Sequence, residues 1–119
     1  MTLDSAQPLP QRTATLEEGE ALAFTALVDG LPTPAFVVRV GGALVAFVDR
    51  CRHQSRSLDL GAGRVLQDGL LPCRHHGALY DPADGRCVAG PCLGARLTRL
   101  RLVARDGAWW CEGREGPTS

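Results

Sequence analysis

Two short segments of the 119-residue sequence each place a cysteine and a histidine at a spacing that can hold a metal. Cys51 and His53 form a C-x-H pair, and Cys73 and His76 form a C-x-x-H pair. In extended chain, residues i and i+2 project to the same side, so the first pair can face one site. A tight turn can bring the second pair together, because Gly77 lets the backbone pass close by. Thiolate and imidazole both bind metals, so these four residues are candidate ligands of one metal centre.

The residue types alone leave the identity of the metal open. Zinc also binds two cysteines and two histidines in a tetrahedron, which would make the chain a zinc-stabilised binding module. The common zinc pattern, however, puts two cysteines in one pair and two histidines in the other. Each pair of this sequence is mixed, so the order of the ligands argues against zinc.

The segments that carry these pairs show the pattern of β-hairpins. Residues 35–40 and 43–49 are β-rich runs on either side of Gly41-Gly42, which has the composition of a two-residue hairpin turn. Residues 20–30 are apolar enough for another strand, and no segment shows a sustained apolar period of 3.6 residues. We therefore expect an all-β fold, an antiparallel β-sandwich or partly closed barrel with a subdomain of hairpin loops. Asp-Gly dipeptides separate further apolar runs at 68–69, 84–85 and 106–107.

Length and charge limit the domain organisation and the partners. The chain is expected to form a single domain over 1–119, with flexible tails at 1–12 and 113–119 and metal-binding loops at about 49–93. Its formal net charge is zero, which gives no general affinity for nucleic acid or for an anionic membrane.

The same sequence indicates a compartment. No apolar run resembles a signal peptide or approaches the roughly 20 residues of a membrane span, so we expect a cytoplasmic protein. Five cysteines without a secretory context favour metal chemistry over a disulfide framework. The cysteines outside the two pairs are expected to be ordinary reduced loop or core residues: Cys87, Cys92 and Cys111. A disulfide or regulatory thiol pair between Cys87 and Cys92 is the alternative.

The two pairs resemble the cluster motif of the Rieske iron–sulfur proteins, which is C-x-H followed by C-x-x-H. The resemblance extends to residues around the pairs and covers the chain from about Ala35 to Val103. The further matching residues are Leu58, Gly61, Gly77, Tyr80, Asp81, Gly85, Gly90, Pro91 and Leu97.

This resemblance implies a Rieske-type 2Fe-2S cluster and a role for each ligand. Cys51 and Cys73 would bind the inner iron, and His53 and His76 would bind the outer, more exposed iron. Such centres have reduction potentials of about −150 to +300 mV. By the same resemblance, Tyr80 would donate a hydrogen bond to the cluster side. Gly90 and Pro91 would belong to a third loop that covers the cluster.

Two departures from the family pattern indicate a subclass. Rieske proteins of cytochrome bc complexes carry a membrane anchor and one more cysteine in each cluster loop, whereas this chain has Arg56 and His75 at those positions. Those high-potential proteins also place a serine where this chain has Ala78. With one hydroxyl donor absent and Tyr80 present, we expect a potential toward the lower part of the family range.

The resemblance implies an electron-transfer protein without an autonomous catalytic site. The chain is too short to add the mononuclear-iron domain of oxygenase subunits. We expect a soluble Rieske-type ferredoxin that passes one electron from a flavin-dependent or NAD(P)H-dependent reductase to a terminal oxidoreductase such as a ring-hydroxylating oxygenase. The alternative is an accessory subunit of a larger enzyme, similar to the small subunit of assimilatory nitrite reductase.

Overall fold

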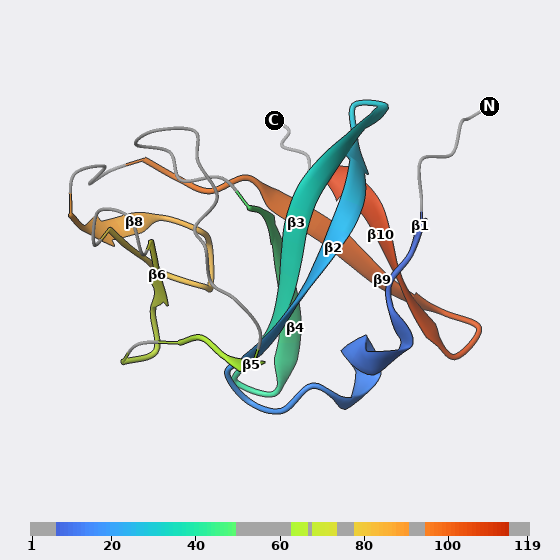
Figure 1. Ribbon diagram of the computed structural model, residues 1–119, viewed down its shortest axis with the longest axis horizontal. Coiled ribbons are helices and arrows are strands. Elements are labelled where there is room, and N and C mark those ends of the chain that lie inside the picture. The colour runs from blue at the N-terminus through green and yellow to red at the C-terminus, as the bar shows by residue number, and fades with distance from the viewer. Residues whose placement is uncertain (1–6, 50–62, 67, 74–77, 91–94, 115–119) are drawn as a thin grey trace.

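A computed structural model describes residues 7–49, 63–66, 68–73, 78–90 and 95–114 of the chain (Figure 1). These residues form short and long β-strands and one 3₁₀-helix, η1. No helix among them is long and apolar enough to cross a membrane. The elements are β1 (Gln7–Pro8), η1 (Gln11–Thr15), β2 (Glu20–Val28), β3 (Leu31–Val40), β4 (Ala43–Val48), β5 (Gly63–Arg64), β6 (Leu71–Pro72), β7 (Leu79–Tyr80), β8 (Cys87–Ala89), β9 (Arg99–Arg105) and β10 (Ala108–Arg114).

The strands make two antiparallel sheets, which confirms the expected all-β fold. The large sheet has seven strands in the order β1-β10-β9-β4-β3-β2-β5. It is nearly closed into a barrel, because β10 also comes close to β2. The small sheet has three strands in the order β6-β7-β8, and Figure 1 shows it on one side of the large sheet.

Strands β3 and β4 are buried on both faces, which explains their continuous apolar runs. Residues 35–38 of β3 and 45–48 of β4 are all buried. Successive side chains of a strand point to opposite faces, so each run contributes to two different cores. Phe36 and Phe47 point into the core shared with the small sheet, whereas Val37 and Ala46 point into the barrel.

The buried hydrophobic residues form two separate cores. The shared core lies between the two sheets and holds Ala21, Phe36, Val38, Val45, Phe47, Val65, Leu71, Cys73, Ala78, Tyr80, Cys87 and Leu97. The barrel core lies inside the large sheet and holds Leu9, Leu16, Ala26, Val28, Ala35, Val37, Ala46, Val48, Leu100 and Cys111.

Tight turns connect the long strands at the glycines that the sequence indicated. Gly41 and Gly42 join the paired residues Val40 and Ala43, and both glycines have positive φ. Asp106-Gly107 connects β9 to β10 in the same way. Positive φ at both central positions is the geometry of a type I′ hairpin turn. A further turn of this kind, Asp29-Gly30, ends β2 at Val28, so the strand expected over 20–30 stops before these two residues.

The expectation of a flexible tail through Arg12 is wrong for the described residues 7–12. Gln7 and Pro8 pair with Cys111 and Trp110 of β10. The Leu9 amide also donates a 2.9 Å hydrogen bond to the Trp109 carbonyl. At the other end, β10 continues through Arg114.

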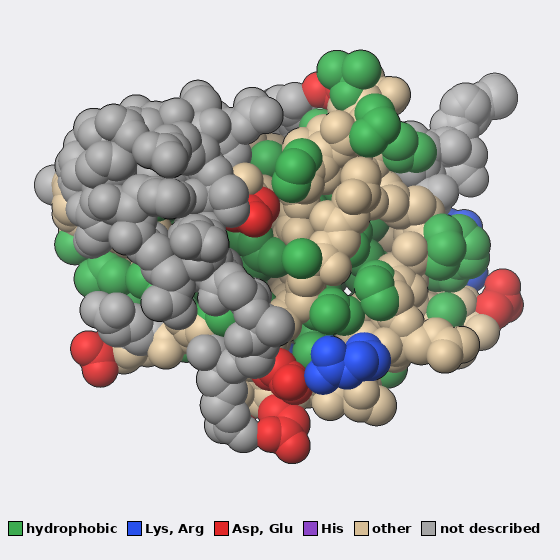
Figure 2. Space-filling view, in the orientation of Figure 1, with side chains coloured by type: hydrophobic (Ala, Val, Ile, Leu, Met, Phe, Trp, Pro, Cys, Tyr) green, Lys and Arg blue, Asp and Glu red, His purple; other side chains and the backbone are tan. Residues whose placement is uncertain are grey.

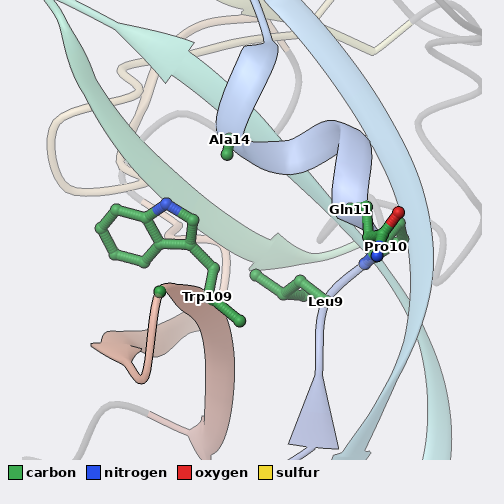
Figure 3. Close-up of a pocket in the computed structure, with 7 residues that line it drawn as sticks. Leu9, Pro10, Gln11, Ala14 and Trp109 are labelled. Carbon is green, nitrogen blue, oxygen red and sulfur yellow. The ribbon is translucent and has the colours of Figure 1, made fainter.

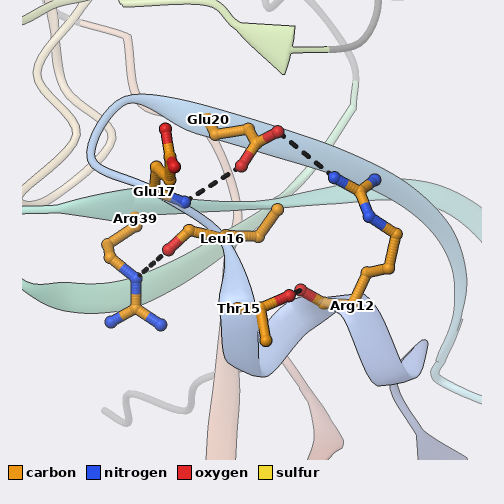
Figure 4. A network of polar contacts seen from close by, with 6 residues as sticks. All are labelled: Arg12, Thr15, Leu16, Glu17, Glu20 and Arg39. Carbon is orange, nitrogen blue, oxygen red and sulfur yellow. Dashed lines mark hydrogen bonds and ion pairs between the residues drawn. The ribbon is translucent and has the colours of Figure 1, made fainter.

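Arg39 fastens η1 to the large sheet, as Figure 4 shows in part. Its guanidinium donates to the Leu16 carbonyl at 2.5 Å, the Ala14 carbonyl at 3.3 Å and the Gly42 carbonyl at 3.0 Å. Arg12 forms a 3.2 Å ion pair with Glu20, whose carboxylate also accepts the Glu17 amide at 3.0 Å. These contacts order a segment that is too short to show a periodic sequence pattern.

Candidate metal centre

Cys73 is the one candidate ligand among the described residues, and it lies directly after β6. Its side chain is buried in the shared core, with 1% of its surface exposed. The Cys73 amide donates a 2.7 Å hydrogen bond to the Ala78 carbonyl. This bond holds together the two ends of segment 74–77, which contains His76 of the C-x-x-H pair.

Tyr80 lies on β7, between β6, which ends one residue before Cys73, and β8, which carries Cys87. It pairs with Leu71 of β6 on one side and with Cys87 of β8 on the other. Its side chain is fully buried in the shared core, together with Cys73. Ala78 belongs to the same core and is also fully buried, so the position where high-potential relatives place a serine offers no hydroxyl.

The two described cysteines outside the pairs, Cys87 and Cys111, are buried in the two cores. The Cys87 thiol donates to the Ala89 carbonyl at 3.2 Å. Cys111 lies in the barrel core on β10, where burial raises the pKa of its thiol. A thiol with a raised pKa is less often ionised and therefore less reactive.

The other candidate residues lie mostly outside the described part of the chain. Gly90 is described; it follows β8 and has a positive φ of 98°. Within the described ranges, no group of three or more His, Cys, Asp and Glu side chains could hold a metal ion. The candidates outside these ranges are Cys51, His53, His76, Gly77 and Pro91, and Cys92 also lies there.

Hydrogen bonds of residues 95–99, before and at the start of β9, join the small sheet to the large one. The Leu97 amide donates to the Gly85 carbonyl, and the Cys87 amide donates to the Ala95 carbonyl, both at 2.7 Å. The Arg99 guanidinium, from β9, donates to the Ala83 carbonyl in the turn before β8. Arg99 follows an ordinary strand pattern, and nothing in the sequence indicates that its guanidinium reaches another sheet.

A cavity among the described residues lies elsewhere, and no candidate ligand lines it. It has a volume of about 300 Å³ and lies between η1 and the turn that joins β9 to β10 (Figure 3). Leu9, Ala14 and Trp109 contribute to its lining. This part of the molecule belongs to the large sheet, whereas Cys73 lies on the small sheet.

The described residues fit an iron–sulfur cluster bound beside the small sheet. A thiolate ligand needs an environment that excludes water, and Cys73 has one among Leu71, Tyr80 and Leu97 of the shared core. The backbone bond from Cys73 to Ala78 closes the segment in which the second ligand of the pair would lie. The mixed donor set of two sulfurs and two nitrogens is the one that Rieske centres use.

The comparisons with known proteins agree with this fit. The model of the Rieske [2Fe-2S] domain family matches residues 10–104, a longer range than the resemblance from Ala35 to Val103. Comparison with curated protein sequences gave no match.

Solved structures with the same fold include ferredoxins and oxygenases. A chain of a complex of reduced oxygenase and oxidised ferredoxin in carbazole 1,9a-dioxygenase is 21% identical, with a TM-score of 0.76, and the match covers 98% of this chain and 100% of that one. The ferredoxin of carbazole 1,9a-dioxygenase from Nocardioides aromaticivorans IC177 is 22% identical, with a TM-score of 0.72 and coverages of 92% and 98%. The terminal oxygenase of carbazole 1,9a-dioxygenase from Novosphingobium sp. KA1 is 20% identical, with a TM-score of 0.73. This match covers 98% of this chain but only 32% of the oxygenase chain. Because the family model spans most of the sequence, the chain belongs to the Rieske [2Fe-2S] domain family, and its cofactor is a Rieske-type 2Fe-2S cluster.

Proposed function

We propose that this chain is a one-electron carrier that takes electrons from a flavin-dependent or NAD(P)H-dependent reductase and delivers them to a terminal oxidoreductase. A ring-hydroxylating oxygenase is the acceptor that we favour. The observation that carries this proposal is the match to the Rieske family over residues 10–104. A Rieske cluster, when bound, supplies one-electron redox chemistry at potentials of about −150 to +300 mV.

The proposed ligands are Cys51 and Cys73 for one iron and His53 and His76 for the other. The burial of Cys73 supports its place at the inner, water-excluded iron. Tyr80 lies in the same core, which supports its role as a hydrogen-bond donor toward the cluster side. Ala78 has no hydroxyl to donate, and we therefore propose a potential in the lower part of the family range.

The structural matches support a carrier that resembles a ferredoxin. This chain covers nearly all of the carbazole dioxygenase ferredoxin but only about a third of the terminal oxygenase. The first of the matched structures is a complex between an oxygenase and a ferredoxin. At these identities the matches establish the fold alone, so the oxygenase partner is part of our proposal.

The described surface favours a carrier over the permanently bound accessory subunit. Permanent subunits bury large apolar faces. Among the described residues, the exposed large hydrophobic side chains are Leu31 and Val88, and they lie on different sheets. On the face in Figure 2, the hydrophobic side chains of the described part are separated by backbone and polar atoms. We propose that the carrier acts in the cytoplasm, where cysteines outside a metal site are ordinarily kept reduced.

The cofactor part of the proposal is tested on protein purified without oxygen. We expect a red-brown protein whose dithionite-reduced electron paramagnetic resonance spectrum has the low average g-value of mixed histidine and cysteine ligation. Cys73→Ser and His76→Ala should lose this spectrum. His75→Ala is the matched control and should keep it. A colourless protein with stoichiometric zinc, or loss of the spectrum in His75→Ala but not in His76→Ala, would contradict the assignment.

The carrier part needs an electron-transfer assay. NADH and a flavin-dependent ferredoxin reductase would supply electrons, and cytochrome c would serve as the acceptor. We expect cytochrome c reduction to depend on the concentration of this chain and to fail with Cys73→Ser. A loaded protein that the reductase cannot reduce, but that co-purifies stoichiometrically with a larger enzyme, would favour the accessory subunit instead.

A further inference from the structure

Gly85 lies closer to its neighbours than a residue with a side chain could. Its φ is +79°, and a Cβ atom at this position would lie 2.9 Å from Cε1 of Phe47 and 3.0 Å from the Leu97 carbonyl oxygen. Real Cβ atoms essentially never come within 3.0 Å of another heavy atom. Gly107 has almost the same φ, +80°, but a Cβ there would meet nothing within 4 Å. Gly85 therefore differs from an ordinary turn glycine by its contact with β4.

The neighbours of Gly85 cannot easily move aside. Phe47 is fully buried, and its ring centroid lies 5.9 Å from that of Phe36. Both backbone groups of Gly85 are also bonded: its amide donates to the Asp81 carbonyl, and its carbonyl accepts the Leu97 amide, each at 2.7 Å. Close-packed interiors transmit such a clash rather than absorb it. A side chain at position 85 would therefore push the small sheet away from β4.

The hydrogen bonds around Gly85 lead directly to the proposed cluster site. Asp81, whose carbonyl accepts the Gly85 amide, follows Tyr80 on β7. Tyr80 pairs with Leu71 of β6, and β6 ends one residue before Cys73. A displacement of Gly85 would therefore be transmitted to Cys73 through the turn that begins at Asp81 and the pairing of Tyr80 with Leu71.

We propose that Gly85 is a positioning residue for the 2Fe-2S cluster. By having no side chain, it lets the turn between β7 and β8 pack directly on Phe47. This contact sets how deeply Cys73 and Tyr80 lie in the shared core, and hence the geometry and polarity that the cluster experiences. The inference rests on the proposed role of Cys73 as a ligand.

The test compares Gly85→Ala with Gly107→Ala. Both variants place an alanine at nearly the same positive φ and therefore carry the same backbone strain, but only the first creates the contact with Phe47. We expect Gly107→Ala to lower the midpoint of thermal unfolding while keeping the reduction potential and g-values of the wild type. Gly85→Ala should lower the unfolding midpoint further and shift both the potential and the g-values.

A second substitution tests whether the contact itself is responsible. Phe47→Leu removes the ring atom nearest to the added methyl group, so Gly85→Ala/Phe47→Leu should regain much of the potential and spectrum of Phe47→Leu alone. If Gly85→Ala does not retain a cluster, the double variant should retain one. A double variant without a cluster, while Phe47→Leu alone has one, would count against the contact.

Failure of the inference is distinguishable from failure of the proposed function. If the wild type lacks the Rieske spectrum, or if Cys73→Ser keeps it, the ligand assignment fails. If the wild type and Cys73→Ser behave as proposed but Gly85→Ala has the potential and g-values of the wild type, the positioning role of Gly85 is overturned.

Discussion

The two sheets of this protein are stabilised in different ways. The large sheet has long strands, and β2 and β3 pair continuously from Ala21–Val38 to Val28–Leu31. The strands of the small sheet have only two or three residues. Such short strands are not stable on their own. The small sheet therefore depends on turn hydrogen bonds and on the shared core, and the large sheet serves as its support.

This difference bears on the cluster, because the proposed ligand Cys73 lies on the dependent sheet. Binding of a metal centre stabilises the folded state by the free energy of binding. We therefore expect cluster binding to stabilise mainly the small sheet, which the polypeptide alone stabilises least. Loosening the shared core should release the cluster, whereas loosening the barrel core should mainly lower global stability.

The largest effect is expected from two matched leucine substitutions. Leu97 lies in the shared core and Leu100 in the barrel core, and the two side chains are 1% and 2% exposed. Leu97→Ala and Leu100→Ala should each lower the free energy of unfolding by about 2–5 kcal/mol, because each leaves a cavity. Only Leu97→Ala should also speed the loss of visible absorption when the folded protein is incubated with an iron chelator.

The measurements for this pair are chemical denaturation followed by circular dichroism and the rate of cluster loss at constant temperature. Equal rates of cluster loss in the two variants would show that the two cores support the small sheet equally. Faster cluster loss in Leu100→Ala than in Leu97→Ala would show that the cluster depends more on the barrel core than on the shared core.

A smaller effect is expected from the hydroxyl group of Tyr80. Tyr80→Phe keeps the ring in the shared core and removes only the hydroxyl group. The expected cost in stability is about 0.5–1.5 kcal/mol, the usual contribution of one hydrogen bond. If the hydroxyl donates toward the cluster side, its loss also lowers the reduction potential, because the reduced state carries one more negative charge. Voltammetry of both proteins measures this shift. Coincident potentials would show that Tyr80 acts only by packing.

Much of this comparison could be predicted from the sequence, because the signals are local. The spacing of Cys73 and His76 predicts a tight turn, and this prediction falls on segment 74–77, which lies outside the described residues; the flanking residues Cys73 and Ala78 are joined by a backbone hydrogen bond. The pairs Gly41-Gly42 and Asp106-Gly107 predicted hairpin turns, since few residues adopt positive φ.

The remaining features depend on residues distant in the sequence. Asp84-Gly85 indicated a turn, but the contact of Gly85 with Phe47 arises only when the small sheet packs on β4. The apolar run at 35–38 indicated a strand, but not that its two faces belong to two different cores. The pairing of β1 with β10 also has no signal in the sequence, because a strand of two residues carries no periodic pattern.

The smallest effect is expected at the ends of two central strands of the large sheet, where Glu18 binds the turn between β3 and β4. Its carboxylate accepts the Gly41 amide at 2.6 Å and the Gly42 amide at 3.0 Å. These bonds hold the pKa of Glu18 below its ordinary value, with a smaller contribution from the nearby charge of Arg39. Because the pKa is lower in the folded state, the carboxylate stabilises the fold above its unfolded-state pKa, and this contribution is lost as the pH falls through the folded-state pKa.

Glu18→Gln tests this contribution and separates it from the cluster. At neutral pH the variant should unfold at a slightly lower temperature than the wild type, because an amide oxygen accepts a weaker hydrogen bond than a carboxylate. The difference should shrink as the pH is lowered, since only the wild type loses a charge at this position. Cluster absorption and reduction potential at neutral pH should be the same in both proteins, because Glu18 contacts the large sheet alone among the described bonds. If the difference in unfolding temperature stays constant with pH, the carboxylate of Glu18 is not the group responsible. If the reduction potential shifts, a change in the large sheet alters the small sheet, and the two sheets are coupled more tightly than their strand lengths imply.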